Sequence, residues 1–349
     1  MLPIGKDGGI MKAMVLEKIS SVEERPLRLV DLPQPVPERG QILVRVSASG
    51  VCHTEIDEIE GRVAPSKFPM ILGHEIVGRV ESLGPEARKF KKGDRVGIAW
   101  INWACGRCSF CLKGEENLCD TAKWTGKDAH GGYAQYTVVS EDFAYPIPEK
   151  FTDVKAAPLL CAGVIGYRAL RLSRMEDGRV LGLYGFGASA HIVIQVAKYK
   201  YLDGKVFVFT RPKQKEHQDL ARKLGADWVG ETGDTPPEKL NCAIDFTPVG
   251  EPVRQALRNL QKGGRVVINA IRKVTPIPEL DYTEHLWYEK EVKSVANVTR
   301  KDAQEFLPLA AEIPIIPETQ EFKLEEANEA LILLKEGKMC GAGVLKMTE

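Results

Sequence analysis

The stretch from Gly178 to Tyr199, GRVLGLYGFGASAHIVIQVAKY, constrains the fold more than any other part of the chain. An apolar strand-like run leads into the tight turn Gly185-Phe186-Gly187, and an amphipathic helical pattern follows. Glycines in such a turn let a pyrophosphate approach the backbone, and the helix N-terminus carries partial positive charge. The third glycine of the usual dinucleotide fingerprint is replaced here by an alanine, which is still small enough for the helix to pack on the strand. The stretch therefore predicts a dinucleotide-binding turn.

Four further buried-type strands are expected after this turn, with helical patterns between the earlier ones. They are KVFVFT (205–210), NCAIDFT (241–247), GRVVINA (264–270) and VKSVANV (292–298). Because strands that alternate with helices form parallel sheets, the segment predicts a doubly wound parallel sheet in an α/β protein.

The length and the charge of the chain limit the expected number of domains and the classes of partner. At 349 residues it exceeds one ordinary hydrophobic core, so two domains are expected. The 48 basic and 48 acidic residues give no single-sign field, which argues against nucleic acid or a membrane surface as a partner. No apolar run approaches a membrane span, and no secretory signal opens the sequence, so we expect a cytoplasmic protein. Residues 1–10 are turn-rich and are interpreted as an extension that precedes a first strand near Met11.

Four of the eight cysteines fall in one short segment, CGRCSFCLKGEENLC. In a reducing compartment such a cluster is more often a metal site than a set of disulfides. Four thiolates complete a tetrahedral zinc shell and leave no position for a substrate, so a structural zinc is expected. An iron-sulfur cluster is disfavoured because its usual spacing and trailing proline are absent. The predicted ligands are Cys105, Cys108, Cys111 and Cys119.

A second, sparser set of metal-binding residue types lies elsewhere in the chain. Cys52 follows a strand-like run in GVCHTE, His74 and Glu75 stand between glycines in LGHEIVG, and Cys161 lies in an apolar stretch. A catalytic zinc takes three protein ligands and keeps one position for water or substrate. We predict Cys52, His74 and Cys161 as ligands, with Glu75 as an exchangeable fourth ligand or a neighbour of the shell. On its own, His74 would be interpreted as a core histidine, but its combination with the other candidate ligands favours a metal site. The two remaining cysteines, Cys242 and Cys340, are interpreted as packing residues.

The order of these motifs resembles the zinc-dependent medium-chain alcohol dehydrogenases over nearly the whole chain from Met11. The resemblance implies a GroES-like β-barrel catalytic domain at 11–160 and 295–349, which encloses a Rossmann domain at 161–294. It further implies that Cys52, His74 and Cys161 bind the catalytic zinc, that Glu75 can enter its shell, and that the four-cysteine segment binds a structural zinc. Self-association through the Rossmann domain, as a dimer or a tetramer, is also implied.

A zinc ion with an open position lowers the pKa of a bound hydroxyl, which prepares an alcohol to give hydride to a nicotinamide. Thr54 is similar to the family's first proton-relay hydroxyl, although a threonine at this place is also ordinary strand chemistry. Relatives often complete the relay with an aspartate and a histidine, where this chain has Glu55, Ile56 and Asp57. Asp57 is either the terminal acceptor or part of a solvated acidic helix face. His53, and more weakly Arg300, are expected to contact the cofactor pyrophosphate.

The end of the strand 205–210 bears on the choice of cofactor. An NAD site normally has an acidic residue about 20 residues past the glycine turn, whereas an arginine there suits the 2′-phosphate of NADP. The strand ends with Thr210 and Arg211, with lysines close by, so NADP is favoured over NAD. In the alternative, Arg211 stacks on the adenine and NAD binds.

The leading functional prediction is reversible hydride transfer between a primary or secondary alcohol and its aldehyde or ketone. A polyol or amino-alcohol dehydrogenase of the same fold is the alternative, but such enzymes often change the third zinc ligand, and Cys161 favours the plain alcohol group. A non-enzymatic zinc module is disfavoured by the balanced charge and by the second, open set of ligands. A zinc-free quinone reductase of the same fold is excluded if these ligands bind metal.

Overall fold

The computed structural model describes residues 9–313, 315, 317–339 and 341–347, and it divides into two compact units. The first contains the described residues of Met1–Cys161, Asn297–Ala311 and Ile316–Glu349, and the second those of Ala162–Ala296 and Glu312–Ile315. The sequence placed the domain boundaries after residues 160 and 294. Most of the expected N-terminal extension, and Cys340, lie outside the described residues. None of the described helices is long and apolar enough to cross a membrane.

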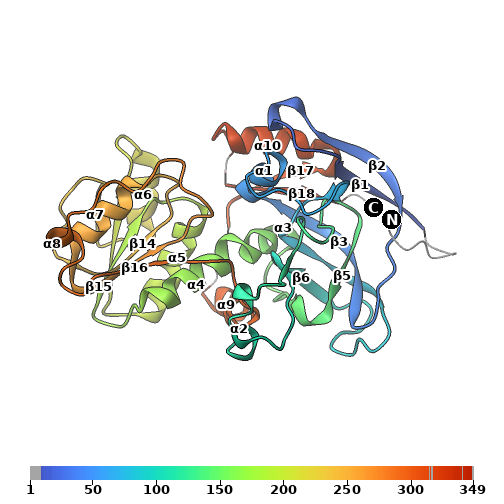
Figure 1. Cartoon of the computed structure of the whole chain (residues 1–349), viewed down its shortest axis with the longest axis horizontal. Helices are drawn as coiled ribbons and strands as arrows, with labels where there is room; N and C mark the ends of the chain where they lie inside the picture. Colours follow the sequence, from blue (N-terminus) through green and yellow to red (C-terminus); the bar gives the residue numbers. More distant parts are fainter. Residues whose placement is uncertain (1–8, 314, 316, 340, 348–349) are drawn as a thin grey trace. The chain divides into compact units, whose positions relative to one another are not determined.

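The first unit is built mainly from antiparallel strands. A three-stranded sheet has the order β2-β1-β4, and a seven-stranded sheet has the order β10-β6-β5-β3-β18-β17 with β9 also paired to β3. Figure 1 shows β18, from the end of the chain, beside β3, which it pairs in antiparallel register. The strands are β1 (Ile10–Leu16), β2 (Leu27–Pro33), β3 (Gln41–Val51), β4 (Met70–Ile71), β5 (Ile76–Leu83), β6 (Arg95–Ile98), β7 (Ile101–Trp103), β8 (Lys123–Trp124), β9 (Tyr136–Ser140), β10 (Ala144–Pro146), β17 (Thr319–Lys323) and β18 (Ala342–Lys346).

The helices of this unit are short, apart from the two near the end of the chain. They are α1 (His53–Ile59), α2 (Ser109–Leu112), α3 (Asp153–Ala156), α9 (Arg300–Glu312) and α10 (Ala327–Lys335), with single 3-10 turns at η1 (Val22–Glu24), η2 (Glu116–Leu118), η3 (Glu141–Phe143), η4 (Ala157–Leu160) and η5 (Leu324–Glu326).

One hydrophobic cluster anchors the helix that follows Cys52. Ile56 and Ile59 of α1 are buried together with Val51 at the end of β3 and Leu331 of α10. Each fully buried aliphatic side chain of this size stabilises the fold by about 1.5–3 kcal/mol. The packing fixes the position of α1, and with it the residues at its N-terminus.

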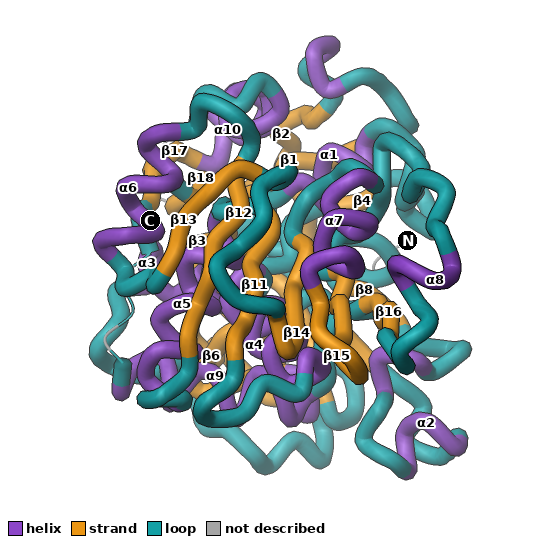
Figure 2. The backbone as a smooth tube through the Cα atoms, turned by 90° about the vertical axis from the view of Figure 1, so that its left-hand side faces the viewer, coloured by secondary structure: helices purple, strands orange, loops and turns teal. Residues whose placement is uncertain are grey.

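The second unit is a six-stranded sheet in which all paired neighbours run parallel. Figure 2 shows its strands side by side, in the order β13-β12-β11-β14-β15-β16. They are β11 (Val180–Tyr184), β12 (Lys205–Thr210), β13 (Trp228–Glu231), β14 (Leu240–Asp245), β15 (Leu260–Ile268) and β16 (Glu291–Ser294), and the helices are α4 (Ala162–Ser173), α5 (Ala188–Lys200), α6 (Lys215–Lys223), α7 (Glu251–Asn259) and α8 (Tyr282–His285).

The topology explains where the glycine turn lies. After β11 the chain adds β12 and β13 on one side, and it then returns to add β14, β15 and β16 on the other. The carboxyl end of β11 is therefore the switch point of the sheet, where ligands of such folds bind.

One strand differs from its prediction. The segment 292–298 was expected to be a buried strand, but β16 is an edge strand whose Val292, Lys293 and Ser294 are exposed. An edge strand has a neighbour on one side only, so an apolar composition does not ensure its burial.

Candidate active site

Cys52 lies immediately before the first turn of α1, in extended backbone conformation. The residue three positions later, Glu55, turns back so that its Oε2 accepts a hydrogen bond from the Cys52 backbone N–H at 2.8 Å. This is the geometry of a capping box, which fixes the entry of the chain into a helix. The thiol of Cys52 is thereby held at the N-terminus of a packed helix.

The second oxygen of Glu55 holds His74. The Nδ1 of His74 lies 2.5 Å from Glu55 Oε1, and the two side chains are 1% and 0% exposed. One carboxylate therefore orients both the backbone of Cys52 and the ring of His74. The other ring nitrogen, Nε2, is buried and has no hydrogen-bond partner among the residues that the structure describes.

Cys161 and Glu75 complete the set. The Sγ atoms of Cys52 and Cys161 lie 3.9 Å apart, and the ligand atoms of Cys52, His74, Glu75 and Cys161 all lie within 4.8 Å of one another. Gly50 makes room for the carboxylate, because a Cβ atom there would lie 1.9 Å from Glu75 Oε2.

These four residues fit a zinc ion. A buried polar atom without a hydrogen bond is costly, and Nε2 of His74 makes none with the described residues although two thiols and a carboxyl group lie close to it. Thiolate sulfur, imidazole nitrogen and carboxylate oxygen are the donor types of catalytic zinc sites. The carboxylate bonded to Nδ1 is the outer partner that metal-binding histidines normally have.

The four groups shift one another's pKa values. The hydrogen bond from Cys161, together with nearby His74, holds the pKa of Cys52 well below its usual range. The pKa of Cys161 is raised because its thiol donates a hydrogen bond to Cys52 and because it is buried. Burial disfavours the charged form of His74, but Glu55 and Cys52 outweigh it and raise its pKa. Burial also raises the pKa of Glu75.

The four-cysteine lobe, defined as residues 105–119, forms a separate site in the same unit. Its four thiols lie within 4.8 Å of one another, and Cys105 accepts a hydrogen bond from the Cys108 backbone at 3.3 Å. Burial raises the pKa of Cys119, but hydrogen bonds from the backbone at Cys105 and from Thr121 outweigh it and lower this pKa to about 6. The pKa of Cys111 is raised by burial to about 12. The lobe thus brings four sulfur donors together.

Thr54 and His53 lie in the first turn of α1. Thr54 is 6% exposed, and its hydroxyl lies 3.7 Å from the Cys52 thiol, which donates to it. His53 is exposed. Asp57, in contrast, is fully buried and accepts a hydrogen bond from Arg62 Nε at 2.6 Å. The interpretation of this segment as a solvated acidic face is wrong, because α1 packs against the core on that side.

The glycine turn of the second unit follows β11 as predicted. Gly185 has φ of 83°, which favours glycine, and a Cβ atom there would lie 2.9 Å from Thr247 Cγ2. Phe186 is buried, and Gly187 precedes the first residue of α5. The small residue expected for helix packing, Ala190, is fully buried.

The predicted cofactor-selecting pair divides into one buried and one exposed residue. Thr210 is fully buried, and its hydroxyl accepts a hydrogen bond from Gln218 at 3.0 Å. Arg211 is exposed; its backbone N–H donates to Gln214 Oε1 at 3.3 Å and its carbonyl oxygen accepts from the Gln214 N–H at 3.4 Å, whereas its guanidinium makes no hydrogen bond or ion pair with the described residues. Arg211 is therefore the residue of the pair with a side chain available to a ligand.

Two residues of the site were not identified from the sequence. Glu55 was seen only as a departure from a relay pattern, although its position three residues after Cys52 is the spacing of a capping box. Trp100, whose ring centroid lies 5.9 Å from that of His74, was expected either to line the substrate pocket or to fill the core. Contacts between residues far apart in sequence leave no such spacing signal.

Comparison with known proteins identifies the family. Residues 38–149 match the alcohol dehydrogenase GroES-like domain. Over 340 residues, 96% of this chain and 97% of the relative, the sequence is 41% identical to a probable alcohol dehydrogenase, AdhA, of Mycobacterium tuberculosis. The chain belongs to the zinc-dependent medium-chain alcohol dehydrogenases. The predicted family and fold class, a GroES-like domain with a Rossmann sheet, are thus confirmed.

Two further known alcohol dehydrogenases match this protein over almost its full length. It is 35% identical to an NAD-dependent alcohol dehydrogenase of Sulfolobus acidocaldarius, over 97% of this chain and 100% of the relative. A cobalt- and zinc-bound thermostable alcohol dehydrogenase from Pyrobaculum aerophilum superposes with a TM-score of 0.85 at 25% identity, with 97% and 100% of the two chains covered. As a member of this family, the protein is an oxidoreductase with alcohol dehydrogenase function, and zinc and a nicotinamide cofactor belong to its chemistry.

Proposed function

We propose that Cys52, His74 and Cys161 hold a catalytic zinc, with Glu75 as an exchangeable fourth ligand, and that the enzyme interconverts alcohols with aldehydes or ketones at this site. The observation that carries the proposal is the buried Nε2 of His74, which makes no hydrogen bond with any described residue and lies beside two thiols and a carboxyl group. When bound, zinc supplies Lewis acidity, which lowers the pKa of a substrate hydroxyl.

Thr54 is the proposed first acceptor of the proton that the alcohol loses. A hydroxyl can accept and donate hydrogen bonds, and burial keeps bulk water away from this one. Asp57 receives no catalytic role, because its carboxylate is engaged by Arg62. The cysteine at position 161 supports a plain alcohol over a polyol or an amino alcohol as substrate.

NADP is proposed as the preferred cofactor. The guanidinium of Arg211 makes no hydrogen bond or ion pair with the described residues, and Lys213 and Lys215 are exposed nearby. Two lysines and an arginine at this strand end suit a phosphate better than a ribose diol. The turn Gly185-Phe186-Gly187 would receive the pyrophosphate, and His53 and Arg300 are proposed as further cofactor-binding residues.

The four-cysteine lobe is proposed to bind a second, structural zinc. Four cysteine ligands saturate a tetrahedral ion, so the expected role of this zinc is to hold the lobe in shape.

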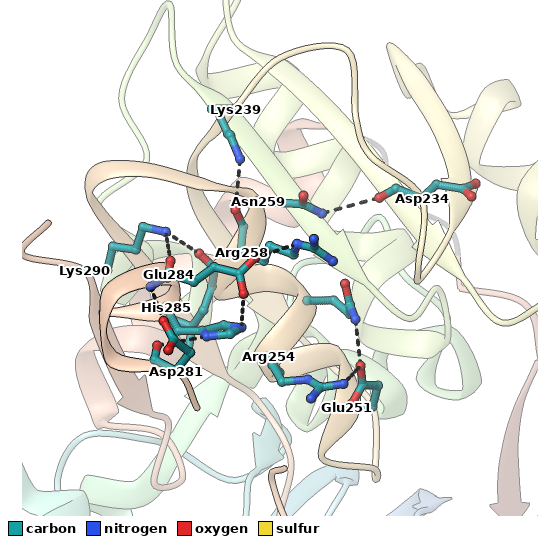
Figure 3. Close-up of polar contacts among 12 residues, drawn as sticks. Asp234, Lys239, Glu251, Arg254, Arg258, Asn259, Asp281, Glu284, His285 and Lys290 are labelled. Atoms are coloured by element: carbon teal, nitrogen blue, oxygen red, sulfur yellow. Dashed lines mark hydrogen bonds and ion pairs between the residues drawn. The ribbon is translucent and has the colours of Figure 1, made fainter. Parts of the chain in front are cut away.

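Self-association, as a dimer or a tetramer, is proposed through the edge of the parallel sheet. β16 is an edge strand, and the preceding segment exposes Tyr282, Trp287 and Tyr288. This segment is fixed to the end of α7, because Lys290 Nζ donates to the carbonyl oxygens of Leu257 and Glu284 at 2.8 and 2.9 Å (Figure 3). Exposed aromatic side chains beside an unpaired strand are typical of an interface.

A steady-state panel of alcohols tests the proposal, with NAD and NADP and before and after removal of metal by a chelator. We expect activity to disappear with the metal, to return when zinc is added, and to be higher with NADP. Activity that survives complete removal of both metals would contradict the zinc mechanism.

A further inference from the structure

An ion pair connects the four-cysteine lobe to the first turn of α9. Glu116 lies in η2, between Cys111 and Cys119, and is 2% exposed. Its Oε1 accepts two hydrogen bonds from Arg300, one from the backbone N–H at 2.8 Å and one from Nε at 3.0 Å. A side chain of the lobe therefore holds both the backbone and the side chain of a residue far away in the sequence.

The backbone bond acts as an additional helix cap. Thr299 and Asp302 already form a local cap, in which the Thr299 N–H and hydroxyl donate to Asp302 Oδ2 at 2.8 and 2.7 Å. The first N–H groups of a helix have no partner within the helix, and a carboxylate at this end is favourable. Glu116 provides this acceptor for Arg300.

The side-chain bond orients the guanidinium. Arg300 Cζ lies 5.2 Å from the centre of the Phe143 ring, and Nε is bonded to Glu116. Within the part of the chain that the structure describes, neither Nη nitrogen of Arg300 has a hydrogen-bond partner. The two Nη groups remain available as a fork that matches the geometry of a phosphate.

We propose that Glu116 is a positioning residue, through which the four-cysteine lobe fixes Arg300 and the start of α9 and keeps the Nη groups available to a cofactor phosphate. The phosphate part of this inference rests on the proposed function. A metal ion that orders residues 105–119 then contributes to cofactor binding as well as to stability.

The test compares Glu116→Gln with Glu115→Gln, a matched change at the exposed neighbouring position. Three quantities are measured on the zinc-loaded enzyme: amide hydrogen exchange in the first turn of α9, the dissociation constant of NADPH by fluorescence, and zinc per chain. In Glu116→Gln we expect exchange to be about 10- to 100-fold faster and NADPH to bind about tenfold more weakly, because bonds to a charged group are lost. Glu115→Gln should match the wild type in all three.

Unchanged exchange in Glu116→Gln would overturn the proposal, and so would an unchanged NADPH constant if Arg300→Gln weakens NADPH binding. If exchange accelerates while neither variant affects NADPH binding, the coupling to α9 stands and the assignment of Arg300 to the cofactor fails. Arg300→Lys provides a variant that retains the backbone bond. It should weaken NADPH binding with exchange near the wild-type rate, and faster exchange in this variant would contradict the separate roles of the two bonds.

Discussion

The carboxylate of Glu55 joins two proposed zinc ligands, since its oxygens lie 2.8 Å from the Cys52 backbone nitrogen and 2.5 Å from His74 Nδ1. Glu55→Gln retains the shape of the side chain but removes its charge. We expect zinc at the catalytic site to bind about 10- to 100-fold more weakly, as for other outer partners of metal-bound histidine. Competition with a fluorescent zinc chelator measures this change.

Glu58→Gln is the matched control. Glu58 is also buried on α1, but neither carboxylate oxygen has a hydrogen-bond partner among the described residues. Burial and the charge of Glu55 raise its pKa, so the neutral form is favoured and glutamine resembles it. Its zinc affinity should equal that of the wild type. Equal losses in the two variants would show that Glu55 has no special role.

Arg211→Asp should shift the cofactor preference toward NAD. Removal of the guanidinium takes away a phosphate partner, and the new carboxylate can accept hydrogen bonds from a ribose diol and repels a phosphate. We expect the ratio of kcat/KM for NADP to that for NAD to fall by about 10- to 100-fold. Arg222→Asp, an exposed change on α6, is the control. An unchanged kcat/KM ratio in Arg211→Asp would contradict the proposal that Arg211 binds the 2′-phosphate of NADP.

Cys111→Ser should reduce the zinc content from two ions per chain to one and lower the melting temperature. Structural zinc sites contribute directly to folding free energy, so a fall of at least about 5–10 °C is expected. Cys242→Ala is the comparison, because this buried cysteine lies in β14 and contacts Met175 rather than a metal-binding group. It should retain both ions, and loss of an ion from this variant would show that zinc content follows stability alone.

His130 should make the protein less stable in mild acid. Burial, and then the charge of Lys67, lower its pKa from 6.5 to about 4, and its Nδ1 accepts a hydrogen bond from the Ile71 N–H at 3.2 Å. Below pH 6.5 the unfolded chain binds a proton that the folded chain does not, so stability falls as the pH decreases toward 4. The expected loss between pH 7.5 and pH 5 is about 2 kcal/mol. Urea unfolding of the wild type and of His130→Gln measures it, and parallel pH profiles would contradict this origin.

The sequence predicted the parts of the fold that follow local patterns. The turn at Gly185 and the parallel strands β11, β12, β14 and β15 were predicted because glycine spacing and apolar runs are local signals. The exposed position of β16 was not predicted, because an edge strand is defined by the absence of a neighbour rather than by its own residues.

The proposed metal ligands were chosen from residue type and family resemblance, but their surroundings were not predicted. The bond from Glu55 to His74 and the bond from Glu116 to Arg300 join segments distant in sequence. No periodicity in one chain reveals such pairs. The burial of Asp57 was likewise decided by the packing of α1 on the core, which the acidic composition of the segment concealed.

Zinc content and alcohol oxidation in Cys52→Ser test the central claim most directly. The account predicts two zinc ions per chain and full activity in the wild type, one ion in the variant, and a kcat/KM at least about a thousandfold lower, because several kcal/mol of transition-state stabilisation are lost. A variant that contains one zinc ion, or none, and oxidises alcohols at the wild-type rate would contradict it.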